Sequence, residues 1–196
     1  MKSSTRPLIM IAAFAGSLAI GLLLVLWLSG GFRGVAAPAA VGGPFQLTDQ
    51  SGQKVTEDSL KGKPSLIFFG FTHCPDICPT ALFEMSEVLR ALGTDADRLN
   101  TYFISVDPDR DTAPIMRDYL SSFDPHLKGL TGTPDEVAKV ITGYRVYAKK
   151  VPTKDGDYTM DHTALIYLMD KDGKFVAPFN LKRKPEEAAT DLKRYL

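Results

Sequence analysis

The sequence predicts an α/β domain, with a mixed sheet flanked by helices, behind one apolar N-terminal helix. Residues 8–28 form a long segment without a charge. Residues 65–71 and 101–106 are continuous apolar runs, which are typical of strands buried on both faces of a sheet. Residues 79–93 carry apolar side chains at helical spacing. Strand and helix signals that alternate in this way favour an α/β architecture.

The segment Leu8–Leu28 is long enough to cross a membrane. It has 21 residues, and a helix rises about 1.5 Å per residue against a bilayer core of about 30 Å. Lys2 and Arg6 precede the segment, whereas only Arg33 follows it closely. The positive-inside rule therefore keeps the N-terminus in the cytoplasm and places the rest of the chain across the membrane.

A cleaved signal peptide is the competing interpretation, because Ala-Pro-Ala at residues 37–39 resembles a small-residue cleavage site. The apolar region of a signal peptide usually has about 7–15 residues, so the sequence favours an uncleaved anchor. We expect residues 1–30 to be a membrane anchor. Residues 31–43 are small and rich in Gly and Pro, and we expect them to be a flexible tether.

Residues 44–196 are numerous enough to bury a core of their own. The chain beyond the tether has 20 basic and 23 acidic residues, which gives a formal charge of −3. A mildly acidic domain without a basic run argues against nucleic acid as a partner. Since the only long apolar segment lies outside it, we expect this domain to be soluble and monomeric.

Turn and periodicity signals divide this domain into elements in the order β-β-β-α-β-α-α-β-β-α. The first two strands surround a Ser51-Gly52 turn, and Thr133 is a candidate N-cap of the third helix. The later elements are strands at 159–170 and 173–179 with a Lys-Asp-Gly hairpin signal between them, and a closing amphipathic helix at 184–196. This order predicts a thioredoxin-like fold.

Cys74 and Cys78 are the only cysteines of the chain, and both lie between the strand at 65–71 and the helix expected from Pro79. Open α/β sheets place their sites outside the carboxyl ends of their strands. The backbone N–H groups at the helix start are expected to lower the pKa values of the two thiols. Thiolates are required both for disulfide exchange and for metal binding.

A purely structural disulfide is the plainest interpretation of the pair in an exported chain. Such a bridge closes only a tiny loop and therefore constrains the unfolded chain little, so the pair points to chemistry instead. The C-x-x-x-C spacing is one residue wider than the C-x-x-C of thioredoxin-like reductants, and it allows both sulfurs to face one ion. A site with two thiolates suits Cu(I), with Zn(II) next, and needs a third ligand.

The chain offers three histidines as third ligand. His73 adjoins Cys74 and is expected to point to solvent, and His126 reads as part of a surface loop. His162 stands before the apolar run at 163–168, at a strand mouth where a central strand can bring it beside the cysteines. A lone histidine there is more often structural than a ligand, and Met160 is either a soft accessory ligand or a packing residue.

Three motifs carry a family resemblance: FFGFTHCPDICPTAL, ISVDPDRDTAP and MDHTALIYLMD, in this order behind one N-terminal helix. Together they resemble the Sco/SenC family of copper proteins, which are required for cytochrome c oxidase assembly. The resemblance covers the whole exported domain. It implies a thioredoxin-like fold in which Cys74, Cys78 and His162 bind copper, as Cu(I), Cu(II) or both, and in which the two cysteines form a redox-active disulfide pair.

The resemblance also implies partners and a location. The acceptor is the dinuclear copper centre of oxidase subunit II, to which the ion is delivered or at which thiols are reduced. A thiol reductant, a copper donor protein or both reload the site. The expected location is a bacterial inner membrane, crossed once, with the C-terminal domain in the periplasm.

Two alternatives belong to the enzyme class. A thiol-disulfide oxidoreductase would reduce the acceptor's cysteines without carrying metal, although no proline directly precedes the strand after His162, where thioredoxin keeps a cis-proline. A peroxiredoxin-like peroxidase would need an arginine near a single reactive cysteine, which the motif does not provide. The segment Asp107–Thr112 reads as a strand end in which Asp111 or Thr112 caps a helix and Arg110 pairs locally; the alternative is a docking or electrostatic role near the site.

Overall fold

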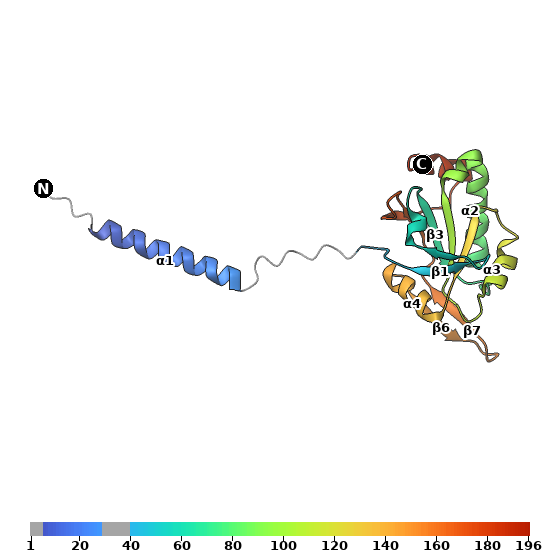
Figure 1. The fold of residues 1–196 in the computed structure, drawn as a ribbon, viewed down its shortest axis with the longest axis horizontal. Helices are drawn as coiled ribbons and strands as arrows, with labels where there is room; N and C mark the ends of the chain where they lie inside the picture. The colour runs from blue at the N-terminus through green and yellow to red at the C-terminus, as the bar shows by residue number, and fades with distance from the viewer. Residues whose placement is uncertain (1–5, 29–39) are drawn as a thin grey trace. The chain divides into compact units, whose positions relative to one another are not determined.

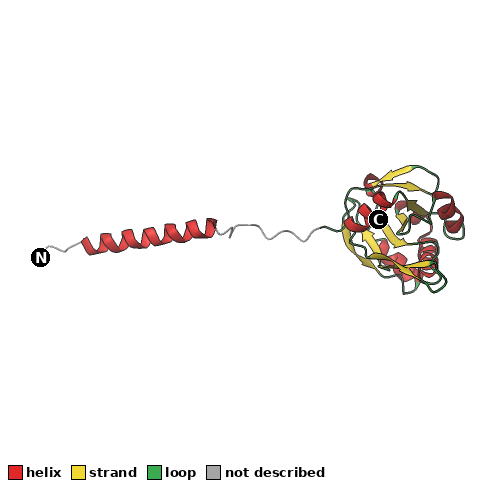
Figure 2. Ribbon diagram, turned by 90° about the horizontal axis from the view of Figure 1, so that it is seen from below, coloured by secondary structure: helices red, strands yellow, loops and turns green. Residues whose placement is uncertain are grey.

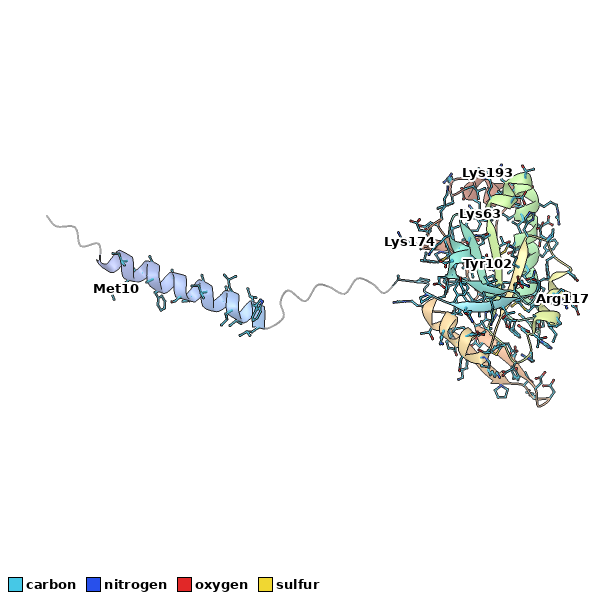
Figure 3. The ribbon with its side chains drawn as sticks, in the orientation of Figure 1. Met10, Lys63, Tyr102, Arg117, Lys174 and Lys193 are labelled. Atoms are coloured by element: carbon cyan, nitrogen blue, oxygen red, sulfur yellow. The ribbon has the colours of Figure 1, made fainter. Side chains whose placement is uncertain are left out.

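The computed structural model describes residues 6–28 and 40–196. The chain divides into two compact units, one up to Ala39 and one from Ala40 to Leu196. In the first, helix α1 (Arg6–Leu28) contains a span, Ile9–Leu28, with a mean hydropathy of 2.6 and no buried residue, which is long and apolar enough to cross a membrane. Figure 3 draws its side chains, with Met10 labelled. Residues 31–39 of the expected tether lie outside the described residues.

The second unit is built on a mixed seven-stranded sheet with the strand order β2-β1-β5-β4-β3-β8-β9 (Figures 1 and 2). Strand β3 is parallel to β4 and antiparallel to β8, and β4 is parallel to β5. The strands are β1 (Gln46–Asp49), β2 (Lys54–Thr56), β3 (Ser65–Gly70), β4 (Asn100–Ser105), β5 (Leu127–Thr131), β8 (Ile166–Met169) and β9 (Phe175–Phe179).

Helices cover both faces of this sheet, as the sequence predicts. All six residues of β3 and five of the six in β4 are buried, which requires cover on either side. Helices α2 (Ile77–Leu92) and α5 (Pro185–Leu192) pack against each other, α3 (Ala113–Leu120) lies against β5, and α4 (Pro134–Gly143) contacts β1. Tyr102 on β4 lies inside the unit, whereas Arg117, Lys174 and Lys193 are exposed (Figure 3).

The predicted helix cap and glycine turns, which depend on residues close together in the sequence, are confirmed. Thr133 caps α4 in a capping box with Glu136, because its side chain accepts from the Glu136 N–H and the Glu136 carboxylate accepts from the Thr133 N–H. Gly52 and Gly173 occupy the β1–β2 and β8–β9 hairpins with φ of 87° and 73°, which only glycine adopts at low cost. Two 3-10 helices, Glu57–Leu60 and Gly93–Arg98, complete the described elements.

Two strands were absent from the predicted order. Strand β5 contains Lys128 and Gly129, which interrupt its apolar pattern, and β6 (Ala148–Pro152) is exposed over most of its length. The expected strand at 159–170 is in fact two strands, because the chain leaves β7 (Tyr158–His162) before it enters β8. β6 and β7 form a separate antiparallel pair, the β6–β7 hairpin, which lies beside α4 in Figure 1.

The pH dependence of stability should include a contribution from His126. Its ring is hydrogen-bonded to Asp124 and then to Asp97, and these carboxylates raise the pKa of His126 above its ordinary value. The folded state therefore holds the proton more tightly than the unfolded chain, and the stabilisation is complete below a pH of about 6.5 and lost as the pH rises through the higher folded pKa.

We expect His126→Asn to lower the free energy of unfolding more at a pH of about 5.5 than at about 8.5, as measured by urea denaturation. The same loss at both pH values would contradict this assignment.

Candidate metal centre

The cysteine loop follows the carboxyl end of β3. The strand ends at Gly70, and α2 begins at Ile77, two residues before the expected start, so that Cys78 lies in the first helical turn. The Cys78 N–H faces the Cys74 sulfur at 3.4 Å. Both cysteines are free thiols; Cys78 is fully buried, and Cys74 is half-buried. The inner thiol is thus fixed by packing, while the outer one remains accessible.

His162 reaches the same place from the last residue of β7. Its Nε2 lies 3.6 Å from the Cys78 sulfur, and its Nδ1 lies 3.1 Å from the Thr163 carbonyl oxygen. A carbonyl oxygen can only accept, so in this hydrogen bond Nδ1 carries the proton. The Nε2 lone pair then points toward the cysteines, which is the arrangement of a histidine prepared to bind a metal.

The three sequence-predicted ligands therefore meet in space. One sulfur from each cysteine and one ring nitrogen of His162 all lie within 4.8 Å of one another. His73 is exposed and bonded to Thr72, and His126 is engaged by two carboxylates. Met160 is buried in the hydrophobic core, where it packs. Among the described residues, this is the group of His, Cys, Asp or Glu side chains whose ligand atoms lie close enough together to hold a metal ion.

The expected effect of the helix start on the thiols is wrong for Cys78. Burial raises the pKa of this thiol far above its ordinary value, and the nearby Cys74 and Asp111 act in the same direction against a backbone hydrogen bond from Phe71. Desolvation thus outweighs the helix N-terminus. The buried thiol stays protonated near neutral pH until a metal cation replaces its proton or oxidation to a disulfide with Cys74 removes it.

Asp111 holds the start of the cysteine loop through hydrogen bonds to its carboxylate. It is fully buried and accepts from the Thr72 N–H at 3.2 Å, the Thr72 hydroxyl at 2.6 Å and the Ser105 hydroxyl at 2.6 Å. Burial raises its pKa. Although Thr112 occupies the N-cap position of α3, it makes no side-chain capping bond there, and the expected cap by either residue is wrong. Asp111 instead ties two strand ends together.

The site has two arms, the cysteine loop and the β6–β7 hairpin that carries His162. Arg110 and Asp107 contact the hairpin arm. The Arg110 Nε donates to Asp107 at 2.5 Å, which confirms the expected local pairing, and its Nη1 donates to the Tyr158 carbonyl oxygen at 2.9 Å. The Tyr158 hydroxyl donates to Asp107 at 2.8 Å. Tyr158 is a residue that sequence reasoning missed. Its alternation with Met160 and His162 places all three on one face of β7, and this was the available signal.

A groove of about 550 Å³ opens beside the site. Its lining includes Asp76 and Ile77 from the cysteine loop and helix start, and Leu165 from the segment that follows His162. Ile77 and Leu165 are 55% and 47% exposed, so both present apolar surface in this groove.

Comparison with known proteins agrees with this geometry. The family model described as SCO1/SenC matches residues 33–196. The chain belongs to the SCO1/SenC family. The resemblance seen in the sequence is thereby confirmed, and so is the thioredoxin-like fold, because the second unit superposes on solved structures of this family.

One of those solved SCO1/SenC structures is that of Bradyrhizobium japonicum ScoI with copper bound. It is 78% identical with a TM-score of 0.79, and the match covers 80% of this chain and 100% of that one. BsSco, described as a member of the Sco family of cytochrome c oxidase assembly proteins with a disulfide switch, is 25% identical with a TM-score of 0.60, over 80% of this chain and 94% of that one.

The mitochondrial SCO1 homolog 1 of Arabidopsis thaliana is 42% identical over 157 residues. The match covers 80% of this SCO1/SenC chain but only 47% of the plant protein, so the chain spans about half the length of that relative.

Gly70 should be required for the position of Cys78. A Cβ at residue 70 would lie 2.7 Å from the Cys78 sulfur and 2.7 Å from Phe103, closer than any normal contact. We expect Gly70→Ala to destabilise the domain by about 1–3 kcal/mol, because the packed neighbours must move. Urea denaturation measures the effect.

The matched control is Gly143→Ala, at the end of α4, where the nearest atom is 3.8 Å away and a side chain fits. Equal stability of the two variants would show that the contact with Cys78 does not constrain the loop.

Proposed function

We propose that the chain is a membrane-tethered copper metallochaperone that helps to assemble the dinuclear copper centre of cytochrome c oxidase subunit II. The observation that carries the proposal is the convergence of Cys74, Cys78 and His162 within 4.8 Å. The copper-bound ScoI relative, at 78% identity, supports copper as the ion.

The donor set is suited to copper. Two thiolates and one imidazole form a soft site, which favours Cu(I) and also accommodates Cu(II), whereas oxygen-preferring ions such as Mg²⁺ gain little from it. The tautomer set by the Thr163 carbonyl leaves Nε2 free to bind. A bound cation would also replace the proton on Cys78, which compensates for the cost of a buried thiolate.

Oxidation would gate the site. Formation of a Cys74–Cys78 disulfide releases two electrons and two protons to an oxidant and removes both thiolates from the metal. A thiol reductant must return two electrons, and a copper donor must then supply the ion, before the protein can act again. The disulfide switch described for BsSco supports this view of the pair.

Transfer to the acceptor would proceed by ligand exchange. The cysteines of subunit II replace Cys74, Cys78 and His162 one at a time, so that the ion keeps soft ligands throughout. Cys74 is the more accessible thiol and is the natural first site of exchange. The groove at Ile77 and Leu165 provides apolar surface next to it for a protein partner.

The apolar helix supports a tethered location. In this proposal residues 1–30 anchor the protein in a bacterial inner membrane, residues 31–43 are the tether, and residues 44–196 act in the periplasm. Lys2 and Arg6 favour a cytoplasmic N-terminus. Confinement near a membrane-bound acceptor raises the effective concentration of the copper domain.

A second candidate function is that of a thiol-disulfide oxidoreductase that reduces the cysteines of the same copper centre. The close approach of the Cys78 N–H to the Cys74 sulfur favours it, because this hydrogen bond holds the accessible outer sulfur next to its partner cysteine. Thiol exchange needs the two cysteines alone, whereas copper binding also needs His162. That residue separates the two functions.

The domain without its anchor should be soluble. We expect residues 40–196, produced alone, to be monomeric without detergent, because the apolar helix is absent and the remaining core is buried within this unit. Size-exclusion chromatography with light scattering measures the state. Precipitation, or a requirement for detergent, would contradict the separation of anchor and domain.

Substitution of His162 should separate metal binding from thiol chemistry. We expect His162→Ala to lower copper affinity at least about 10-fold, by loss of a ligand, while disulfide formation and reduction remain near the parent level. Cys74→Ser and Cys78→Ser should each abolish both properties. Competition titration with a Cu(I) chelator and thiol counting provide the two measurements.

His73→Ala is the matched control, since His73 adjoins Cys74 but is exposed and bonded to Thr72. It should retain both properties. Parent-level copper affinity in His162→Ala, together with normal oxidase assembly, would favour the oxidoreductase.

A further inference from the structure

We propose that Arg110 is a positioning residue. It holds the β6–β7 hairpin, and with it His162, in the correct position beside the cysteine loop. The inference rests on the proposed copper function and concerns a residue that touches neither the ion nor its ligands. It follows from the contacts that Arg110 makes with both arms of the site.

The two arms come from distant parts of the chain. Cys78 and His162 are 84 residues apart. The hairpin that carries His162 pairs only with itself among the described strands, and a two-stranded sheet is marginally stable alone. The position of His162 therefore depends on what holds the hairpin to the rest of the domain.

Arg110 contacts the hairpin on β7. Its guanidinium carbon lies 3.8 Å above the centre of the Tyr158 ring, and its Nη1 donates to the Tyr158 carbonyl oxygen at 2.9 Å and approaches Asp157 at 3.4 Å. Tyr158 and His162 lie on the same face of the strand. A shift of Tyr158 along the strand would therefore carry His162 with it.

Arg110 also faces the cysteine arm. Its guanidinium lies 5.9 Å from the Phe71 ring centre, and the Phe71 ring meets the His162 ring edge-on at 5.7 Å. The Asp107 carboxylate, which is fully buried, receives one bond from Arg110 and one from Tyr158. Arg110 thus sits between the residue that begins the cysteine loop and the residue that begins β7.

A planar guanidinium is needed for this arrangement. It stacks on Tyr158 with its face while its edge donates in two directions, and the ammonium of a lysine cannot do both. One donor, Nη2, is buried without a hydrogen-bond partner among the described residues, so the group is held at some cost to stability. The contacts of Arg110 therefore fix the position of the hairpin, although its unpaired Nη2 lowers the stability of the folded domain.

Lys150 supports the same hairpin less directly. It lies 4.6 Å from the centre of the Tyr158 ring and pairs with Asp109. Both members of this ion pair are exposed, and exposed ion pairs contribute little. Of the two cations that contact Tyr158, Arg110 is therefore the one with the less exposed contacts, while Met160 holds the hairpin through the hydrophobic core.

The test is a double-mutant cycle on the full-length protein in detergent, with Cu(I) and Cu(II) as probes. We expect Arg110→Gln to lower copper affinity about 10-fold or more, the usual effect of losing a residue that orients a ligand. In a His162→Ala background the same change should alter affinity by no more than about twofold, because there is no ligand left to position. The electronic spectrum of the Cu(II) form should change in the single variant.

Metal-free protein gives an independent measurement. Arg110→Gln should speed amide hydrogen exchange in residues 158–162 and leave β3 and β4 unchanged. Arg183→Gln is the matched control, because Arg183 also lies over a ring, Phe179 at 5.1 Å, and pairs with Asp191, yet contacts neither arm. If Arg110→Gln fails to fold, Tyr158→Leu removes the same stacking from the hairpin side and should give the same results.

Each outcome decides a separate point. A loss of affinity that persists undiminished in the His162→Ala background, or parent-level affinity in Arg110→Gln, overturns the positioning role while leaving the copper site intact. Parent-level affinity in His162→Ala overturns the ligand set itself, and the positioning role with it.

Discussion

The site depends on the directions of the strands on either side of β3. Cys74 and Cys78 follow the carboxyl end of β3, and the parallel neighbour β4 brings its own carboxyl end, with Asp107 beyond it, to the same edge of the sheet. The antiparallel neighbour β8 runs the other way, so its amino end and the preceding His162 arrive there too. The two cysteines and Asp107, which follow strands, and His162, which precedes one, reach the same edge because β3 has one neighbour of each kind.

Burial then determines the chemistry available at that edge. Cys78, Asp107 and Asp111 are all fully buried, and ionisable groups are rarely found there unless they are paired. The two carboxylates are paired with hydroxyls, a backbone N–H and Arg110. Burial raises the pKa of the Cys78 thiol, and among the described residues no cationic side chain pairs with it. A metal ion could take the place of the proton on this buried thiol.

Sequence reasoning identified what depends on local pattern. The two buried strands, the glycine turns and the Thr133 cap follow from side chains acting on near neighbours, and the cysteines and His162 stand out by chemical type. The hairpin strand β6 could not be found in this way, because its exposed, lysine-containing sequence has no apolar periodicity. The bond between Arg110 and Tyr158 spans 48 residues, and no local pattern encodes such a contact.

In the proposed function, the separation of the proposed ligands along the chain would give the oxidised and the copper-loaded states different effects on the whole domain. A disulfide would join Cys74 to Cys78, only four residues apart, whereas an ion held by Cys78 and His162 would join positions 84 residues apart. The loaded domain would thus be cross-linked over about half of its length, and the oxidised domain would not. In this proposal, loss of the ion would loosen the domain, so resistance to proteolysis would report whether the site holds copper.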